Sequence, residues 1–155
     1  MFEVTTHSPE ETAGLAERIA EKLPRGTVIC LEGNLGAGKT LFVQSLAKSL
    51  GVTGEVTSPT FNLMNIYENG VMPIAHFDLY RLEYDSELEE IGFYEYSYLP
   101  EGLVIIEWAD KFPESMPEDY LCIQIERGTA ETERHFSFSA IGDMSEILKE
   151  LEKSC

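Results

Sequence analysis

The sequence is poor in basic residues. Only 11 Lys and Arg stand against 28 Asp and Glu among 155 residues, which gives a formal net charge of −17. The basic residues are also scattered, whereas neutralising the phosphates of a nucleic acid requires clustered Lys and Arg. We therefore expect little direct binding of nucleic acid by this chain alone. The acid excess instead favours a solvated, self-repelling surface or a face that docks a basic partner.

Cysteine is also sparse, and long apolar runs are missing. The three cysteines, Cys30, Cys122 and Cys155, are odd in number and far apart, which fits reduced thiols in the cytosol better than a disulfide framework or a metal site. The longest aliphatic run, residues 103–106, is too short to span a bilayer. The N-terminal residues lack the basic and apolar segments of a signal peptide. We expect a cytoplasmic protein.

The length and composition indicate one globular domain over residues 1–155. Hydrophobic residues make up 43% of the chain. A chain of this length buries about two thirds of its unfolded surface in a single core. No repeat, low-complexity tract or linker divides it.

Cap signals and periodicity predict helices and strands in alternation. Ser8 and Pro9 are typical of a helix start, and apolar residues at every fourth position continue this helix until Pro24. The β-rich segment 27–31 predicts a buried strand. A second helix is expected after it, ending at Gly51.

A hairpin is predicted in the middle of the chain. Asn69-Gly70 separates two apolar runs, and both residues tolerate positive φ, so strands near 61–67 and 71–78 should pair antiparallel. The remaining expected elements are a helix at 86–91, strands at 102–108, 120–125 and 135–139, and a helix at 145–151. The pattern predicts a single α/β domain with a mixed, mostly parallel sheet that includes an antiparallel hairpin and is flanked by helices.

The stretch LEGNLGAGKT, residues 31–40, carries the clearest chemistry. It matches the pattern G-x-x-x-x-G-K-[ST], which a random chain of this length would match less than about 1% of the time. Its glycines let backbone N–H groups point at phosphate oxygens, Lys39 can reach the β- and γ-phosphates, and Thr40 can offer a hydroxyl to Mg²⁺. We expect a P-loop NTPase domain. The Asn-Lys-x-Asp and Asp-x-x-Gly signatures of GTPases are absent, which favours ATP by elimination.

A P-loop also requires an acidic side chain to complete its metal site. Two apolar strands end in an acid: Asp78 follows the run 74–77, and Glu107 follows the run 104–106. One of these carboxylates could hold Mg²⁺ while the other orients the attacking water. The residues alone do not assign the two roles.

Four segments together make the chain recognisable. GNLGAGKT, TSPTF, HFDLYR and IIEWAD, in this order, resemble the TsaE family, the small ATPases of bacterial threonylcarbamoyladenosine biosynthesis on tRNA. The resemblance covers nearly the whole chain. It implies a compact P-loop fold with a mixed sheet, ATP and Mg²⁺ as cofactors, and slow intrinsic hydrolysis. It also implies a complex with two partner proteins, TsaB and TsaD, in which TsaD transfers the threonylcarbamoyl group and ATP hydrolysis lets the complex turn over.

The resemblance further implies roles for single residues. Asp78 would be the catalytic acid beside Lys39 and Glu107, and Thr40 and Glu107 would contact Mg²⁺. Residues 57–60 would form a switch-like loop near the γ-phosphate. The nucleotide-binding residues expected from the family are Ser8, Pro9 and Thr12 near the adenine, and Leu35, Gly36, Ala37, Gly38, Lys39 and Thr40 around the phosphates. The resemblance leaves open whether Arg127 and Arg134 also contact the nucleotide.

Two other functions could use the same loop. A small-molecule kinase would need several arginines over the phosphates, and the later part of the chain supplies only Arg81, Arg127 and Arg134. A nucleotide-sensing scaffold would bind ATP without needing to cleave it.

Three residues within these motifs have two interpretations each, and a fourth, Tyr80, has one. Trp108 could pack or sense the nucleotide, and Arg81 could stabilise transition-state charge or form a surface ion pair. His76 could be a hydrogen-bonded site residue or a core residue. Tyr80 is expected to pack with its hydroxyl bonded.

Overall fold

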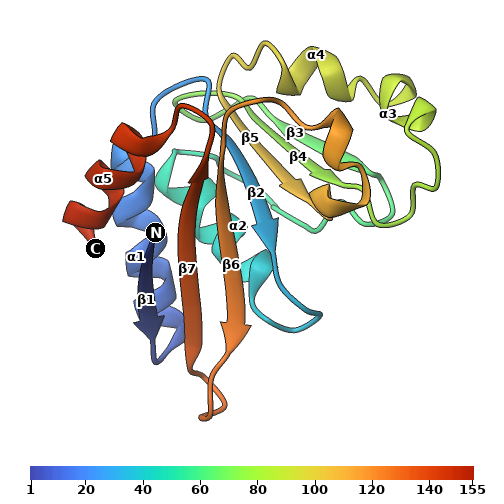
Figure 1. Cartoon of the computed structure of the whole chain (residues 1–155). Helices are drawn as coiled ribbons and strands as arrows, with labels where there is room; N and C mark the ends of the chain where they lie inside the picture. Colours follow the sequence, from blue (N-terminus) through green and yellow to red (C-terminus); the bar gives the residue numbers. More distant parts are fainter.

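A seven-stranded sheet lies between helices in the computed structural model, which describes residues 1–155 (Figure 1). The strands are β1 (Phe2–Thr6), β2 (Val28–Glu32), β3 (Met64–Tyr67), β4 (Ile74–Asp78), β5 (Leu103–Glu107), β6 (Tyr120–Arg127) and β7 (Arg134–Ile141). The helices are α1 (Pro9–Lys22), α2 (Lys39–Ser49), α3 (Ser86–Glu90), α4 (Phe93–Ser97) and α5 (Ser145–Ser154), with short 3-10 turns at Ala109–Lys111 and Pro113–Ser115.

Four parallel strands form the centre of the sheet. The strand order is β1-β7-β6-β2-β5-β4-β3, and the pairs β6–β2, β2–β5 and β5–β4 are parallel. The outer pairs β1–β7, β7–β6 and β4–β3 are antiparallel. The predicted fold class is confirmed, including the antiparallel pair formed by β3 and β4. The carboxyl ends of the central strands meet at one edge of the sheet, where open α/β sheets bind ligands.

The two faces of the sheet contribute to two separate cores. On one face, residues such as Ile29 and Ile105 pack under α1, α2 and α5 in a cluster of 27 buried residues. On the other, Cys30 and Ile106 belong to a cluster of 13 buried residues that α3 and α4 help to cover. Burial on both faces explains why β2, β4 and β5 are apolar along most of their length.

The first two helices begin and end through local signals. The Ser8 hydroxyl accepts a hydrogen bond from the N–H of Glu11 at 3.1 Å, and Pro9 occupies the first turn of α1. After α2, Gly51 has φ +86°, a left-handed conformation that closes a helix without the clash a Cβ would bring.

The tip between β3 and β4 corrects one expectation. Neither Asn69 nor Gly70 has a positive φ, and the connection spans 68–73 instead of a tight two-residue turn. The tip packs instead on the chain that follows α2. The N–H of Val71 donates to the carbonyl of Leu50 at 2.7 Å, and Asn69 Nδ2 donates to the carbonyl of Thr53 at 2.9 Å. These tertiary hydrogen bonds override the local turn preference.

β1 and α4 were not expected from the sequence. β1 is held by pairing with β7 from the far end of the chain, and Phe2 stacks on Phe138 with ring centroids 4.5 Å apart. α4 is a single short turn that begins after Gly92, whose φ is +75°. No helix in the chain is both long and apolar enough to cross a membrane, and all three cysteines are free thiols.

Candidate nucleotide-binding site

The glycine loop joins β2 to α2 at the carboxyl edge of the sheet. Gly36 and Gly38 have φ values of +81° and +105°, which an L side chain rarely adopts. A Cβ on Gly33 would lie 2.8 Å from the carbonyl oxygen of Ile125, so only glycine lets the loop pass this close to β6. The N–H of Ala37 donates to the carbonyl of Asn34 at 3.0 Å. The loop thus has the curled backbone that the motif predicts.

Glu107 lies at the centre of a charge network that also includes Lys39 and His76. Nζ of the partly buried Lys39 is 3.4 Å from Oε1 of Glu107, while Nε2 of His76 is 2.6 Å from Oε2 of the same carboxylate. His76 and Glu107 are 1% and 5% exposed. His76 is therefore a hydrogen-bonded site residue, which decides between its two interpretations. Its Nδ1 has no hydrogen-bond partner.

This network lowers the pKa of Glu107. Burial alone would raise that pKa, because a carboxylate loses hydration inside the protein. The hydrogen bond and charge of His76, together with the charge of Lys39, outweigh burial and hold the pKa of Glu107 below its usual value. The side chain is therefore an anion at neutral pH.

Asp78 lies beside Glu107 on the neighbouring strand. The two residues are register partners at the ends of β4 and β5, and both are buried. The Thr60 hydroxyl donates to Oδ2 of Asp78 at 2.9 Å, and the N–H of Tyr80 donates to Oδ1 at 3.0 Å. Both carboxylates are thus fixed by hydrogen bonds at the strand ends.

The TSPT segment, residues 57–60, is tied to the same corner. Asn65 Nδ2 donates to the carbonyl of Thr57 at 3.2 Å, and the Thr57 N–H donates to the Tyr67 hydroxyl at 3.2 Å. Thr60 makes the contact to Asp78. Residues of β3 therefore hold this loop in place next to Asp78.

Trp108 follows Glu107 in a strained conformation. Its φ is +62°, unusual for a bulky residue and a feature that clusters at functional sites. Nζ of Lys39 lies 5.4 Å from the centroid of its ring system, and the ring of Tyr80 lies 4.8 Å away on centroids. Trp108 is half-buried and faces the site.

The expectation for Tyr80 was wrong, and the structure excludes one of the two interpretations of Arg81, the surface ion pair. Tyr80 is 54% exposed, and its hydroxyl makes no hydrogen bond, because the ring lies outside the core against Trp108. Arg81 forms no ion pair. Its guanidinium lies 5.6 Å from the centroid of the exposed Phe61 ring.

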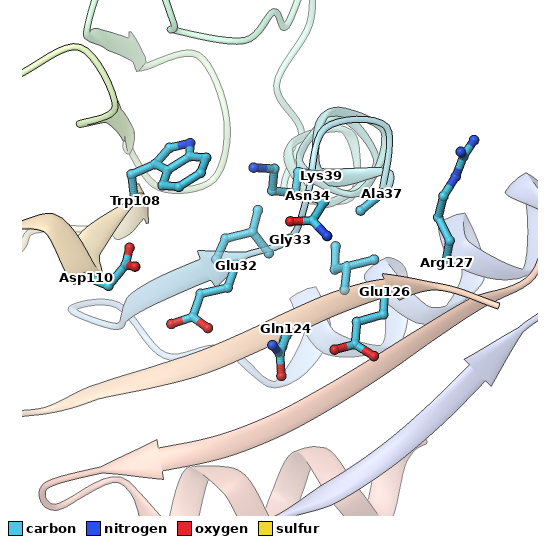
Figure 2. Close-up of a pocket in the computed structure, with 12 residues that line it drawn as sticks. Glu32, Gly33, Asn34, Ala37, Lys39, Trp108, Asp110, Gln124, Glu126 and Arg127 are labelled. Carbon is cyan, nitrogen blue, oxygen red and sulfur yellow. The ribbon is translucent and has the colours of Figure 1, made fainter.

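An open cavity of about 470 Å³ adjoins the loop (Figure 2). Lys39 and Trp108 lie along one part of its wall, and Arg127 extends from the end of β6. The wall also carries polar side chains that sequence reasoning missed, namely Glu32, Asp110, Gln124 and Glu126. The only signal for the β6 members was polar residues at alternate positions of that strand. Their nearness to the loop depends on the pairing of β6 with β2.

A second, smaller hollow of about 70 Å³ lies where α1 meets the loop. Pro9 and Thr12 line it together with Ala37, Gly38 and Arg134. Arg134 also donates from Nε to the carbonyl of Ala37 at 2.9 Å. The structure thus brings two of the three residues expected near the adenine to the phosphate loop.

The other expected residues have different surroundings. Ser8 caps α1 and does not line this hollow. Leu35 is fully exposed at the tip of the loop, and Thr40 is exposed in the first turn of α2. Leu41, which follows Thr40, lines the small hollow with its apolar side chain. The end of the motif therefore offers a single hydroxyl, that of Thr40.

The residues present fit a magnesium ion. No group of three or more His, Cys, Asp or Glu side chains could enclose a metal. Mg²⁺ at phosphate sites commonly takes one or two protein ligands and completes its shell with waters and phosphate oxygens. The Thr40 hydroxyl and the anionic Glu107 supply oxygen donors of that kind.

Comparison with known proteins gives one family. The family model described as "Threonylcarbamoyl adenosine biosynthesis protein TsaE" matches residues 6–136. A Bacillus subtilis (strain 168) protein named tRNA threonylcarbamoyladenosine biosynthesis protein TsaE is 41% identical over 145 residues, covering 94% of this chain and 89% of the relative. A protein of the same name from Aquifex aeolicus is 45% identical over 111 residues, 70% of this chain and 77% of the relative.

A solved structure agrees with the sequence relatives. The crystal structure of Bacillus subtilis YdiB is similar with a TM-score of 0.80 at 34% identity, covering 98% of this chain and 94% of that one. The likeness therefore includes the sheet, the glycine loop and the helices around it.

Proposed function

The chain belongs to the TsaE family of threonylcarbamoyl adenosine biosynthesis proteins, and from that premise we propose that it binds ATP with Mg²⁺ and hydrolyses it in support of tRNA modification. The partners in this proposal are TsaB and TsaD. One observation carries it. Lys39, at the end of the glycine loop, is paired at 3.4 Å with the carboxylate of Glu107, and the carboxylate of Asp78 lies next to Glu107 on the neighbouring strand.

The loop would hold the triphosphate. Its N–H groups and the positive end of α2 favour anionic oxygens, and Lys39 would exchange part of its contact with Glu107 for the β- and γ-phosphates. The hollow lined by Pro9 and Thr12 would receive the base, with Arg134 between base and phosphates. Leu35 contributes backbone only, because its side chain points to solvent.

Thr40 and Glu107 would hold the metal. When bound, Mg²⁺ neutralises charge on the β- and γ-phosphate oxygens. His76 fixes one oxygen of Glu107 at 2.6 Å, which leaves the other for the ion or for a water bound to it. The low pKa of Glu107 keeps this ligand ionised.

Asp78 would orient the attacking water. Its Oδ2 accepts from Thr60 and its Oδ1 from the N–H of Tyr80, so the carboxylate is held at the strand end beside Glu107. A water bound to this carboxylate would donate one proton to it and face the γ-phosphate. Thr60 would couple the 57–60 loop to that position.

The acidic surface fits a division of labour. A net charge of −17 disfavours phosphate backbones, so most of the tRNA contact is assigned to the partner proteins. The chain itself would supply the energy of ATP hydrolysis to the assembly.

Steady-state ATPase assays of the chain alone and with TsaB and TsaD test this function. We expect slow turnover alone and a severalfold rise with both partners. Lys39→Ala should abolish the rise, while Lys48→Ala, an exposed lysine on the same helix, should leave it intact. Equal turnover with and without partners, or phosphoryl transfer to a metabolite in place of water, would refute the proposal.

A further inference from the structure

A third cavity, called the groove below, lies at the opposite edge of the sheet from the glycine loop. It has a volume of about 380 Å³, at the small end of the range for ligand pockets. Its floor is formed where β4 and β5 begin, and α4 with the following turn forms one wall. The floor residues Ile74, Ala75, Leu103 and Val104 are at most 3% exposed, so the apolar surface open to an occupant is that of Ile66, Pro73, Tyr96 and Leu99 around them.

The floor of this groove is rigid. The N–H of Leu103 donates to the carbonyl of Pro73 at 2.9 Å, which fixes the start of β5 against the start of β4. A Cβ on Gly102 would lie 2.0 Å from the carbonyl oxygen of Pro73, so the backbone segments before β4 and β5 are in direct contact there. The groove is therefore preformed and needs no opening of the core.

Two side chains at the rim leave apolar surface in water. Leu99 is 82% exposed and Tyr96 is 38% exposed. Both belong to the segment GFYEYSYL, which the nucleotide site does not use. An apolar side chain entering the groove would contact them and the strand ends together.

The rim is uniformly negative. Glu68, Glu95 and Glu101 line the groove, all three are exposed, and no Lys or Arg lines it. None of the three takes part in an ion pair, because the salt bridges of the chain lie elsewhere. An occupant would have to bring positive charge to offset these carboxylates.

We propose that this groove docks a basic segment of a partner protein, in which an aliphatic or aromatic anchor side chain is flanked by Lys or Arg. The anchor would pack on Tyr96, Leu99 and the neighbouring Ile66 and Pro73. The flanking cations would pair with Glu68, Glu95 and Glu101. Charge complementarity selects this occupant over an acidic peptide or a nucleic acid, both of which the rim repels.

The groove is separate from the nucleotide site. It lies at the amino-terminal ends of β4 and β5, whereas Asp78 and Glu107 lie at their carboxyl ends, about 15 Å away for strands of this length. Occupation of the groove therefore leaves the glycine loop accessible. The inference does not depend on ATP hydrolysis.

Fluorescence anisotropy with a labelled peptide tests the docking site. The probe is fluoresceinated Lys-Arg-Leu-Phe-Arg-Lys, titrated with the full chain at about 0.15 M salt, where charges more than ~8 Å apart are largely screened. A probe with serines in place of Leu-Phe separates the apolar contribution. Glu95→Lys/Glu101→Lys reverses charge at the rim, and Glu114→Lys/Glu152→Lys makes the same net change at exposed positions outside it.

We expect saturable binding that the rim variant weakens at least about tenfold and the control variant by less than about twofold. The serine probe should bind at least about tenfold more weakly, and Leu99→Ala should weaken the apolar probe alone. If both charge variants weakened binding equally, or if the serine probe bound as well as the apolar one, general attraction to an acidic protein would explain the result and the docking site would be refuted. Absence of saturable binding would refute it as well.

Discussion

Replacing Glu107 with glutamine removes the charge from the central network while keeping its shape. The carboxylate accepts from His76 at 2.6 Å and pairs with Lys39 at 3.4 Å. Hydrogen bonds to charged groups contribute about 1.5–3 kcal/mol, and breaking a buried ion pair costs about 3–5 kcal/mol. Lys39 retains some access to water and glutamine keeps one acceptor, so we expect a loss of about 2 kcal/mol at pH 7. For a chain of this size the loss lowers Tm by about 4–8 °C.

The pH dependence of this loss identifies its origin. The pKa of Glu107 is lower in the folded chain than the ordinary value of 4.5, so its stabilisation is complete above that pH. It is lost as the pH falls through the folded-state pKa, because protonation then removes the charge that the native contacts favour. The gap between wild type and Glu107→Gln should therefore close in acid.

Urea unfolding followed by circular dichroism from pH 7 to about pH 3 measures the gap. Glu152→Gln, at an exposed position outside the ion pairs, is the matched control and should stay within about 0.5 kcal/mol of wild type. A Glu107→Gln variant as stable as wild type at pH 7, or a gap of unchanged size in acid, would show that the network does not stabilise the fold as reasoned.

Three further outcomes follow from local geometry. Gly38→Ala forces a Cβ onto φ +105° and should cost about 1–2 kcal/mol in urea unfolding, with loss of ATP binding by filter assay; unchanged ATP affinity would contradict the role of the loop. Ser8→Ala removes the α1 cap and should cost about 1 kcal/mol by the same unfolding assay, whereas a neutral result would mean that water replaces the cap. Burial raises the pKa of Cys122 to about 11 and that of Cys30 still further. A thiol reagent at pH 8 should therefore modify the exposed Cys155 first, and Cys30 only when the protein unfolds. Rapid labelling of Cys30 in the native protein would contradict its burial.

The sequence predicted most reliably those features that local chemistry decides. Ser8 with Pro9, and Gly51, mark helix ends because caps act within one turn of the chain. Asp78 and Glu107 could be chosen as site residues because each ends an apolar strand. Their adjacency depends on the parallel pairing of β4 with β5, which places both strand ends at the same edge of the sheet.

Features that depend on distant pairing were not predictable in the same way. β1 forms because it pairs with β7, which lies near the other end of the sequence. The conformation of the Asn69-Gly70 tip is determined by contacts with residues that follow α2. The cavity wall from Gln124 and Glu126 required the alignment of β6 with β2. Tyr80 was expected to pack with its hydroxyl hydrogen-bonded, but its ring lies against Trp108 at the surface and its hydroxyl makes no hydrogen bond.

The most direct test of the account is calorimetric titration of the chain with ATP and magnesium. We expect one saturable site in the wild type and in Lys48→Ala, and no measurable heat with Lys39→Ala. Binding that survives Lys39→Ala unchanged, or no binding of ATP to the wild type at all, would contradict the assignment of residues 33–40 as the phosphate-binding loop.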